Sequence, residues 1–173
     1  MDGGAERLER LGAQHAPALL EFERVNRAYF ARSISDRGDA YFREFTARLH
    51  ALLAEQDAGI CHFHVVTDAR GELIGRVNLV DVADGAAELG YRIGERSAGR
   101  GVATRAVAEV CRLAAASYGL SALTAMTTLG NTASRTVLAR NGFTVTGDTE
   151  IKGQPALRYR RWLDGALRDR PLI

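Results

Sequence analysis

A short turn with two glycines and two arginines is the part of the sequence best suited to binding an anion. In the segment Arg96-Ser97-Ala98-Gly99-Arg100-Gly101 the glycines let the backbone approach a ligand closely, and a helical apolar pattern begins directly afterwards at Val102. The first amides of a helix have no partner inside it, and the aligned peptide dipoles place about half a positive charge there. Arg96 and Arg100 add charge that can reach phosphate oxygens. The turn therefore predicts a phosphate or pyrophosphate site, and an ordinary strand-to-helix turn with exposed arginines is the alternative.

Two better-known phosphate-binding motifs fit this turn less well. A P-loop would need a lysine and a hydroxyl residue where Arg100 and Gly101 stand, although the gap from Gly94 to Gly99 is right. The dinucleotide fingerprint would need a third glycine at Thr104, and no β-α-β unit precedes the turn. Neither motif is supported.

The composition indicates one globular domain, which we expect to span residues 1–173. With 46% hydrophobic and 25% charged residues, a chain of this length builds a core without a disulfide or metal. The net charge of +2 is too small to argue for non-specific nucleic-acid binding. Cys61 and Cys111 are far apart and predict reduced thiols, and no signal-like or 18-residue apolar segment occurs. We expect a soluble, cytoplasmic protein without a membrane partner.

The elements that must position the turn alternate between strand and helix patterns. The expected elements, in order, are a strand at 8–11, a helix opened by 12–17 and carrying apolar residues up to 29, a loop at 32–39, a helix over 41–53, strands at 60–66, 73–80 and 87–93, a helix from 102, a strand at 120–128, a helix from the cap Asn131 to Arg140, strands at 143–145 and 156–162, and a polar tail from Leu163. These elements predict an α+β fold with a central, mostly antiparallel mixed β-sheet of six to seven strands flanked by about four helices.

The element order and two separated motifs together resemble the GCN5-related N-acetyltransferase (GNAT) superfamily over nearly the whole chain. The first motif is the Arg-x-x-Gly-x-Gly turn, and the second runs from Asn131 through Ser134 to Asn141-Gly142-Phe143. With Glu88-Leu89-Gly90-Tyr91 before the turn, the pattern is most similar to the ribosomal-protein N-terminal acetyltransferase (RimJ/RimL-like) branch.

The resemblance implies acetyl-CoA as the cosubstrate, with no metal. Its pyrophosphate would be bound by the amides of 97–102, and its pantetheine arm would lie along the strand 89–93 as an added strand does. The Leu89 amide would donate to the thioester oxygen as that oxygen gains charge. The residues expected to contact the cosubstrate are Leu89, Tyr91, Ile93, Arg96, Ser97, Ala98, Gly99, Arg100, Gly101, Val102, Ala103 and Asn131.

Acetyl transfer needs an unprotonated amine, a base for its proton and a proton donor for the departing thiolate. We expect Glu88 to be the base, acting through water, and Ser134 to be the donor. The alternatives are a surface carboxylate and an ordinary first-turn helix residue. Other members of the superfamily have a Glu and a Tyr where this chain has Met126 and Leu138, so that acid-base pair is absent.

The expected activity is acetyl-CoA-dependent N-acetylation of a primary amine by direct transfer in a ternary complex. The acceptor would be a protein N-terminus or a small-molecule amine, and the protein a monomer or a homodimer. A catalytically inactive acyl-CoA-binding module, acting as a sensor or scaffold, is the alternative. Binding of nucleic acid by the C-terminal arginines is a weaker hypothesis. Binding of a metal by His62 and His64 is weaker too, since these two histidines have no further ligand nearby in the sequence.

Overall fold

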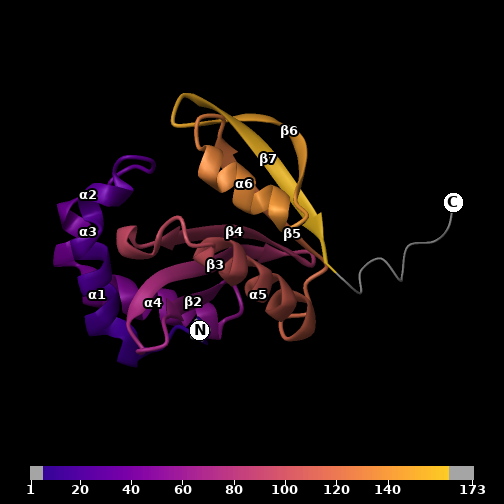
Figure 1. Cartoon of the computed structure of the whole chain (residues 1–173). Helices are drawn as coiled ribbons and strands as arrows, with labels where there is room; N and C mark the ends of the chain where they lie inside the picture. Colours follow the sequence, from indigo (N-terminus) through magenta and orange to yellow (C-terminus); the bar gives the residue numbers. More distant parts are fainter. Residues whose placement is uncertain (1–5, 164–173) are drawn as a thin grey trace, which may run out of the picture.

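A single seven-stranded sheet, in the order β1-β2-β3-β4-β5-β7-β6, forms the centre of the molecule (Figure 1). The computed structural model describes residues 6–163. The strands are β1 (Arg7–Arg10), β2 (His62–Thr67), β3 (Leu73–Ala83), β4 (Ala86–Ile93), β5 (Ala122–Thr128), β6 (Thr144–Ile151) and β7 (Gln154–Trp162). Every neighbouring pair is antiparallel except β4–β5, which is parallel. The predicted α+β fold with a mostly antiparallel mixed sheet is confirmed.

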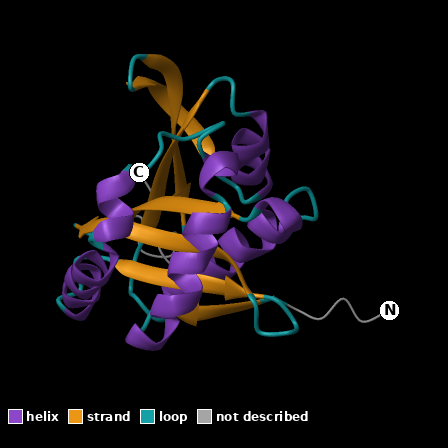
Figure 2. Ribbon diagram, turned by 90° about the vertical axis from the view of Figure 1, so that its left-hand side faces the viewer, coloured by secondary structure: helices purple, strands orange, loops and turns teal. Residues whose placement is uncertain are grey.

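Helices lie against both faces of the sheet (Figures 1 and 2). They are α1 (Ala16–Val25), α2 (Arg27–Phe30), α3 (Asp39–Arg43), α4 (Phe45–Asp57), α5 (Val102–Ala116) and α6 (Thr132–Arg140), with 3₁₀ turns at Ala13–His15 and Glu95–Ser97. One core cluster joins α1–α4 to Phe63 and Val65, and the other joins α5 and α6 to Val77 and Leu123. No helix within 6–163 has the length and apolar character needed to cross a bilayer.

The two helices predicted near the N-terminus are each divided in the structure. The first is interrupted at Asn26, whose side-chain amide donates to the Phe22 carbonyl at 2.9 Å and accepts from the Glu95 amide at 2.9 Å. A side chain that bonds to backbone in this way competes with a regular helix. The second is divided at Glu44. The described part of the chain therefore has six α-helices where about four were expected.

The C-terminal hairpin also differs from the prediction. Strand β6 extends to Ile151 instead of ending at Val145, because it pairs with β7 as far as the turn at Lys152. Leu163 does not begin a polar tail: it is 1% exposed, and its amide donates to the Ser121 carbonyl at 2.9 Å. The rest of the expected tail, with its arginines 168 and 170, lies outside the described residues.

The sheet splits between β4 and β5. These strands pair only from Ala86 to Glu88, opposite Ala122 to Thr124. Beyond that point β4 remains paired with β3 and β5 with β7, so the two halves of the sheet separate. In the described chain, the β4 edge from 89 to 93 that faces β5 therefore has no strand beside it.

Strand alternation directs the β4 side chains to two different environments. Leu89, Tyr91 and Ile93 pack with the α5 core cluster. Glu88, Gly90 and Arg92 consequently face the side on which α1–α4 lie. The split is thus lined by different chemical groups on its two sides.

Candidate active site

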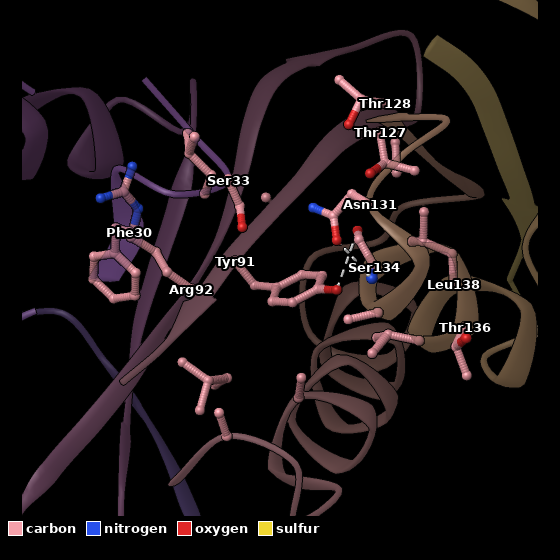
Figure 3. Close-up of a pocket in the computed structure, with 18 of the residues that line it drawn as sticks. Phe30, Ser33, Tyr91, Arg92, Thr127, Thr128, Asn131, Ser134, Thr136 and Leu138 are labelled. Atoms are coloured by element: carbon pink, nitrogen blue, oxygen red, sulfur yellow. Dashed lines mark hydrogen bonds between the residues drawn. The ribbon is translucent and has the colours of Figure 1, made fainter. Parts of the chain in front are cut away.

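A cavity of about 950 Å³ occupies the split between β4 and β5 (Figure 3). Its walls come from β4, β5, the start of α5, α6, the loop after α2 and the β6–β7 turn. Most of the residues predicted for the site line this cavity. They are Leu89, Tyr91, Ile93, Ser97, Ala98, Gly99, Gly101, Val102, Ala103, Asn131 and Ser134. Arg96, Arg100 and Glu88 are not on its wall, although Arg96 and Arg100 are exposed beside it in the same turn.

The turn before α5 presents free backbone amides at one end of the cavity. The Ser97 and Ala98 amides already donate to the carbonyls of Gly94 and Glu95, at 3.0 and 3.2 Å. No residue in the described chain accepts a hydrogen bond from the amides of 99–104. The amides open to an anion thus begin two residues later than the sequence suggested.

Glycine is required where this turn meets the helix. Gly101 precedes α5 with a φ of +76°, and a Cβ there would lie 2.8 Å from Nη1 of Arg105. Gly99 also has a positive φ, of +72°, but a Cβ there would meet nothing within 4 Å. A side chain is rarely found at either φ, and the open space at Gly99 leaves room for a ligand group.

At the start of α6, three side chains converge on the cavity (Figure 3). The Asn131 Oδ1 accepts from the Ser134 amide at 3.1 Å and caps the helix, as predicted. The Tyr91 hydroxyl donates to the Ser134 Oγ at 3.2 Å. Burial raises the pKa of Tyr91, and the bond to Ser134 offsets this only in part, so the phenol stays protonated. Ser134 therefore keeps its own proton for a group in the cavity.

Glu88 lies just below the open part of the split. It pairs with Thr124 in the last β4–β5 pair and precedes Gly90, which lines the cavity, by two residues on the same face. Burial, with the nearby charge of Asp81, raises the pKa of this half-buried carboxyl. Its role as a base stays a prediction, and its position requires a water molecule to carry the proton.

A buried charge cluster, which the sequence analysis missed, supports one wall of the cavity. Glu23 of α1 is 1% exposed and accepts from Arg37 at 3.0 Å twice, from Arg76 at 3.0 Å and from Arg92 at 3.2 Å. Burial alone would raise the pKa of Glu23, but the three guanidinium groups hold it below its usual value. Arg92 also lies 4.8 Å from the ring centre of Phe30 and lines the cavity. The sequence signal that could have revealed this cluster is Glu23 itself, a glutamate next to Phe22 on the apolar side of its helix.

Met126 and Leu138 occupy the positions where other members have acid-base residues. Met126 is 42% exposed on the wall, and Leu138 is 1% exposed in the core. Neither transfers a proton, so proton transfer depends on other residues.

The two histidines of β2 pack on Tyr118. The His62 ring stacks on that tyrosine with centroids 3.7 Å apart, and His64 Nε2 lies 2.6 Å from its hydroxyl. No group of three or more metal ligands occurs among residues 6–163.

A split mixed sheet, with free helix-start amides at one end of the split and hydroxyl donors within it, is an arrangement suited to an acyl-CoA-dependent transferase. The family model for the acetyltransferase (GNAT) domain matches residues 7–144. The chain belongs to the GNAT family and is an N-acetyltransferase, and enzymes of this family take the acetyl group from acetyl-CoA. Among curated proteins, none matches the sequence significantly.

Solved structures of several acetyltransferases share this fold. The ribosomal-protein-S5-alanine acetyltransferase of Vibrio fischeri has a TM-score of 0.86 at 20% identity, covering 92% of this chain and 94% of its own. RimJ of Mycobacterium smegmatis, in complex with a CoA disulfide, has a TM-score of 0.83 at 22% identity, covering 92% and 83%. The spermidine N-acetyltransferase of Vibrio cholerae, in complex with CoA and spermine, has a TM-score of 0.76 at 18% identity, covering 94% and 98%. At these identities the likeness establishes the fold alone.

Proposed function

We propose that the protein transfers an acetyl group from acetyl-CoA directly to an α-amino group in a ternary complex. The observation that carries this proposal is the split between β4 and β5, with free amides at 99–104 and the Tyr91–Ser134 pair on its walls. One end suits a diphosphate, and the other suits a reacting thioester. The α-amino group is the finer part of the proposal.

The cosubstrate binds through groups that the fold leaves unpaired. Its diphosphate accepts from the amides of 99–104, where the dipole of α5 adds positive charge. Its pantetheine arm pairs with the β4 edge at 89–93 as an extra strand. This places the thioester near Ser134, with the Leu89 amide as the donor to the oxygen that becomes negative.

The charges of the cavity favour an amine that loses its proton easily. Arg32, Arg92, Arg140 and Lys152 line it, and none of its described lining residues is Asp, Glu or His. Positive charge lowers the pKa of a bound amine. An α-amino group, with a pKa of about 7.8, is about one-third neutral at pH 7.5, whereas an alkylamine with a pKa of about 10.4 is about 0.1% neutral. The site is therefore matched to α-amines rather than to polyamines.

Each bond and each proton of the transfer is assigned to a named group or to solvent. The amine nitrogen attacks the thioester carbon, the carbon–sulfur bond breaks, and the amide bond forms. The proton of the amine passes to Glu88 through water, and the thiolate receives a proton from Ser134. Ser134 then regains a proton from solvent, to which Glu88 releases the proton that it took, while Tyr91 keeps its own proton and holds the Ser134 oxygen through its hydrogen bond.

Replacing Ser134 with alanine tests this assignment. Ser134→Ala should lower kcat about 100-fold or more with α-amine acceptors, because a lost general acid costs about 10²–10⁴ in rate. Calorimetry should show little change in the affinity for CoA. Ser117→Ala, an exposed serine at the far end of α5, is the matched control and should keep full activity.

Two outcomes would contradict the proposal. Wild-type kcat in Ser134→Ala would remove Ser134 as the donor. Binding of acetyl-CoA by the wild-type protein without thiol release on any amine would support the non-catalytic module, to which the apolar Met126 and Leu138 also point.

A further inference from the structure

The charges at the mouth of the cavity, and on the strands beside it, indicate what lies next to the reacting amine. We propose that the acceptor is a polypeptide N-terminus whose second to fourth residues are acidic. This inference rests on the proposed α-amine transfer and adds the class of its substrate.

The mouth of the cavity is positively charged on both sides. Arg32 belongs to the loop after α2, and Lys152 to the turn between β6 and β7. Both are exposed, and no carboxylate in the described chain pairs with either; Arg32 packs over the Tyr29 ring at 5.8 Å. Deeper inside, Arg92 belongs to a cluster of three arginines around the single carboxylate of Glu23. An anionic group entering the cavity thus meets a net positive charge.

The same charge continues outside the cavity across β7. Met126, on the cavity wall, pairs with Arg158, and Arg160 follows two residues later on the same face. Both arginines are exposed: Arg158 donates to the Thr149 hydroxyl at 3.3 Å, and Arg160 lies 5.4 Å from the ring centre of Trp162. Neither makes an ion pair with a carboxylate in the described chain.

Strand register keeps the nearby carboxylates away from this face. Asp148 and Glu150 of β6 pair with Leu157 and Pro155, so they point to the opposite side from Arg158. On β4, the carboxylate of this face is Glu88, half-buried at the closed end of the split. The exposed part of the face over β5 and β7 therefore carries positive charge, whereas the exposed Asp81 lies near Glu88, at the closed end of the split.

A peptide chain matches the distances involved. Neighbouring strands lie about 4.8 Å apart, and an extended peptide advances about 3.3 Å per residue. An N-terminus in the cavity beside Met126 would thus bring its second to fourth side chains to Lys152 and Arg158. A single amino acid offers no second to fourth side chain to these two residues, and a polyamine would place its charges against like charges.

A matched set of peptides tests the proposal. We would compare peptides with serine first, followed by three glutamates, three alanines or three lysines, and would measure kcat/KM by thiol release from acetyl-CoA. Spermidine and free glutamate complete the set. The kcat/KM for the glutamate peptide should exceed that for the alanine peptide by about tenfold and that for the lysine peptide by more. These ratios should shrink at high salt.

Reversing the charge of two residues in the protein is a second test of the proposal. The double variant Lys152→Glu, Arg158→Glu should lose the preference for the glutamate peptide and favour the lysine peptide. Arg70→Glu, an exposed arginine in the β2–β3 turn, is the control and should behave as wild type.

The possible results separate this inference from the proposed function. Equal or better use of the alanine or lysine peptide, or acetylation of spermidine or free glutamate in preference to peptides, would overturn the inference. Calorimetric binding of acetyl-CoA with no acetylation of any α-amine would overturn the proposed function instead.

Discussion

Replacing Glu23 with glutamine should destabilise the protein by about 3 kcal/mol. The substitution keeps the size of the side chain but removes the single negative charge bonded to Arg37, Arg76 and Arg92. Removing one partner of a buried ion pair costs about 3–5 kcal/mol, because the remaining charge stays buried without compensation. The lower value applies here because the Arg37 side chain is 26% exposed and water can solvate it.

Thermal unfolding measures this effect against a matched control. For a chain of this length 1 kcal/mol shifts Tm by about 2–4 °C, so Glu23→Gln should melt about 6–12 °C below wild type. Glu44→Gln removes a carboxylate from a pair whose side chains are 49% and 58% exposed, and should shift Tm by no more than about 2 °C.

The pH dependence provides an independent check on the same carboxylate. Because the pKa of Glu23 is depressed in the folded protein, its contribution is present above the usual pKa of a glutamate and is lost as pH falls through the depressed value. The difference between wild type and Glu23→Gln should therefore narrow as the solution is acidified. A variant that melts with wild type at neutral pH, or a difference that does not change with acidification, would refute the reasoning.

Two further predictions concern the cosubstrate and the base. Gly99→Asp places a carboxylate in the open space beside the free amides and should weaken CoA binding about tenfold to hundredfold by calorimetry, because like charges repel. Gly119→Asp, at a similar positive φ beyond the other end of α5, should leave the affinity for CoA unchanged. If both variants lost the same affinity, backbone strain would be the cause. Glu88→Gln should flatten the acidic limb of the pH profile of kcat/KM, which burial and Asp81 place at a raised pKa; an unaltered profile would exclude Glu88 as the base.

Local signals in the sequence predicted the parts of the fold nearest the site. Apolar alternation up to Ile93 and a helical period from Val102 placed both ends of β4 and the start of α5 within one residue of their observed positions. The length of β6 was missed because this strand, from Thr144 to Ile151, has exposed polar residues on both faces, and its partner β7 defines it. Asn26 was missed because its partner Glu95 is distant in the sequence.

The candidate site was likewise predicted where its signals are local in the sequence and missed where they join distant residues. The turn at 99–101 and the cap at Asn131 are local, and both were predicted. The bond between Tyr91 and Ser134 joins residues 43 positions apart, so Tyr91 was expected only to contact the cosubstrate. The cluster around Glu23 draws on four separate segments, and no pattern within one segment reveals it.

Within residues 6–163, β4 and β5 pair at three positions, from Ala86 to Glu88 with Ala122 to Thr124. A cosubstrate lying between the halves would complete their hydrogen bonding, so part of the folding free energy would come from a metabolite. A ligand at 100 times its Kd adds about 2.7 kcal/mol to stability. The resistance of the folded protein to proteolysis would then rise and fall with the concentration of acetyl-CoA around it.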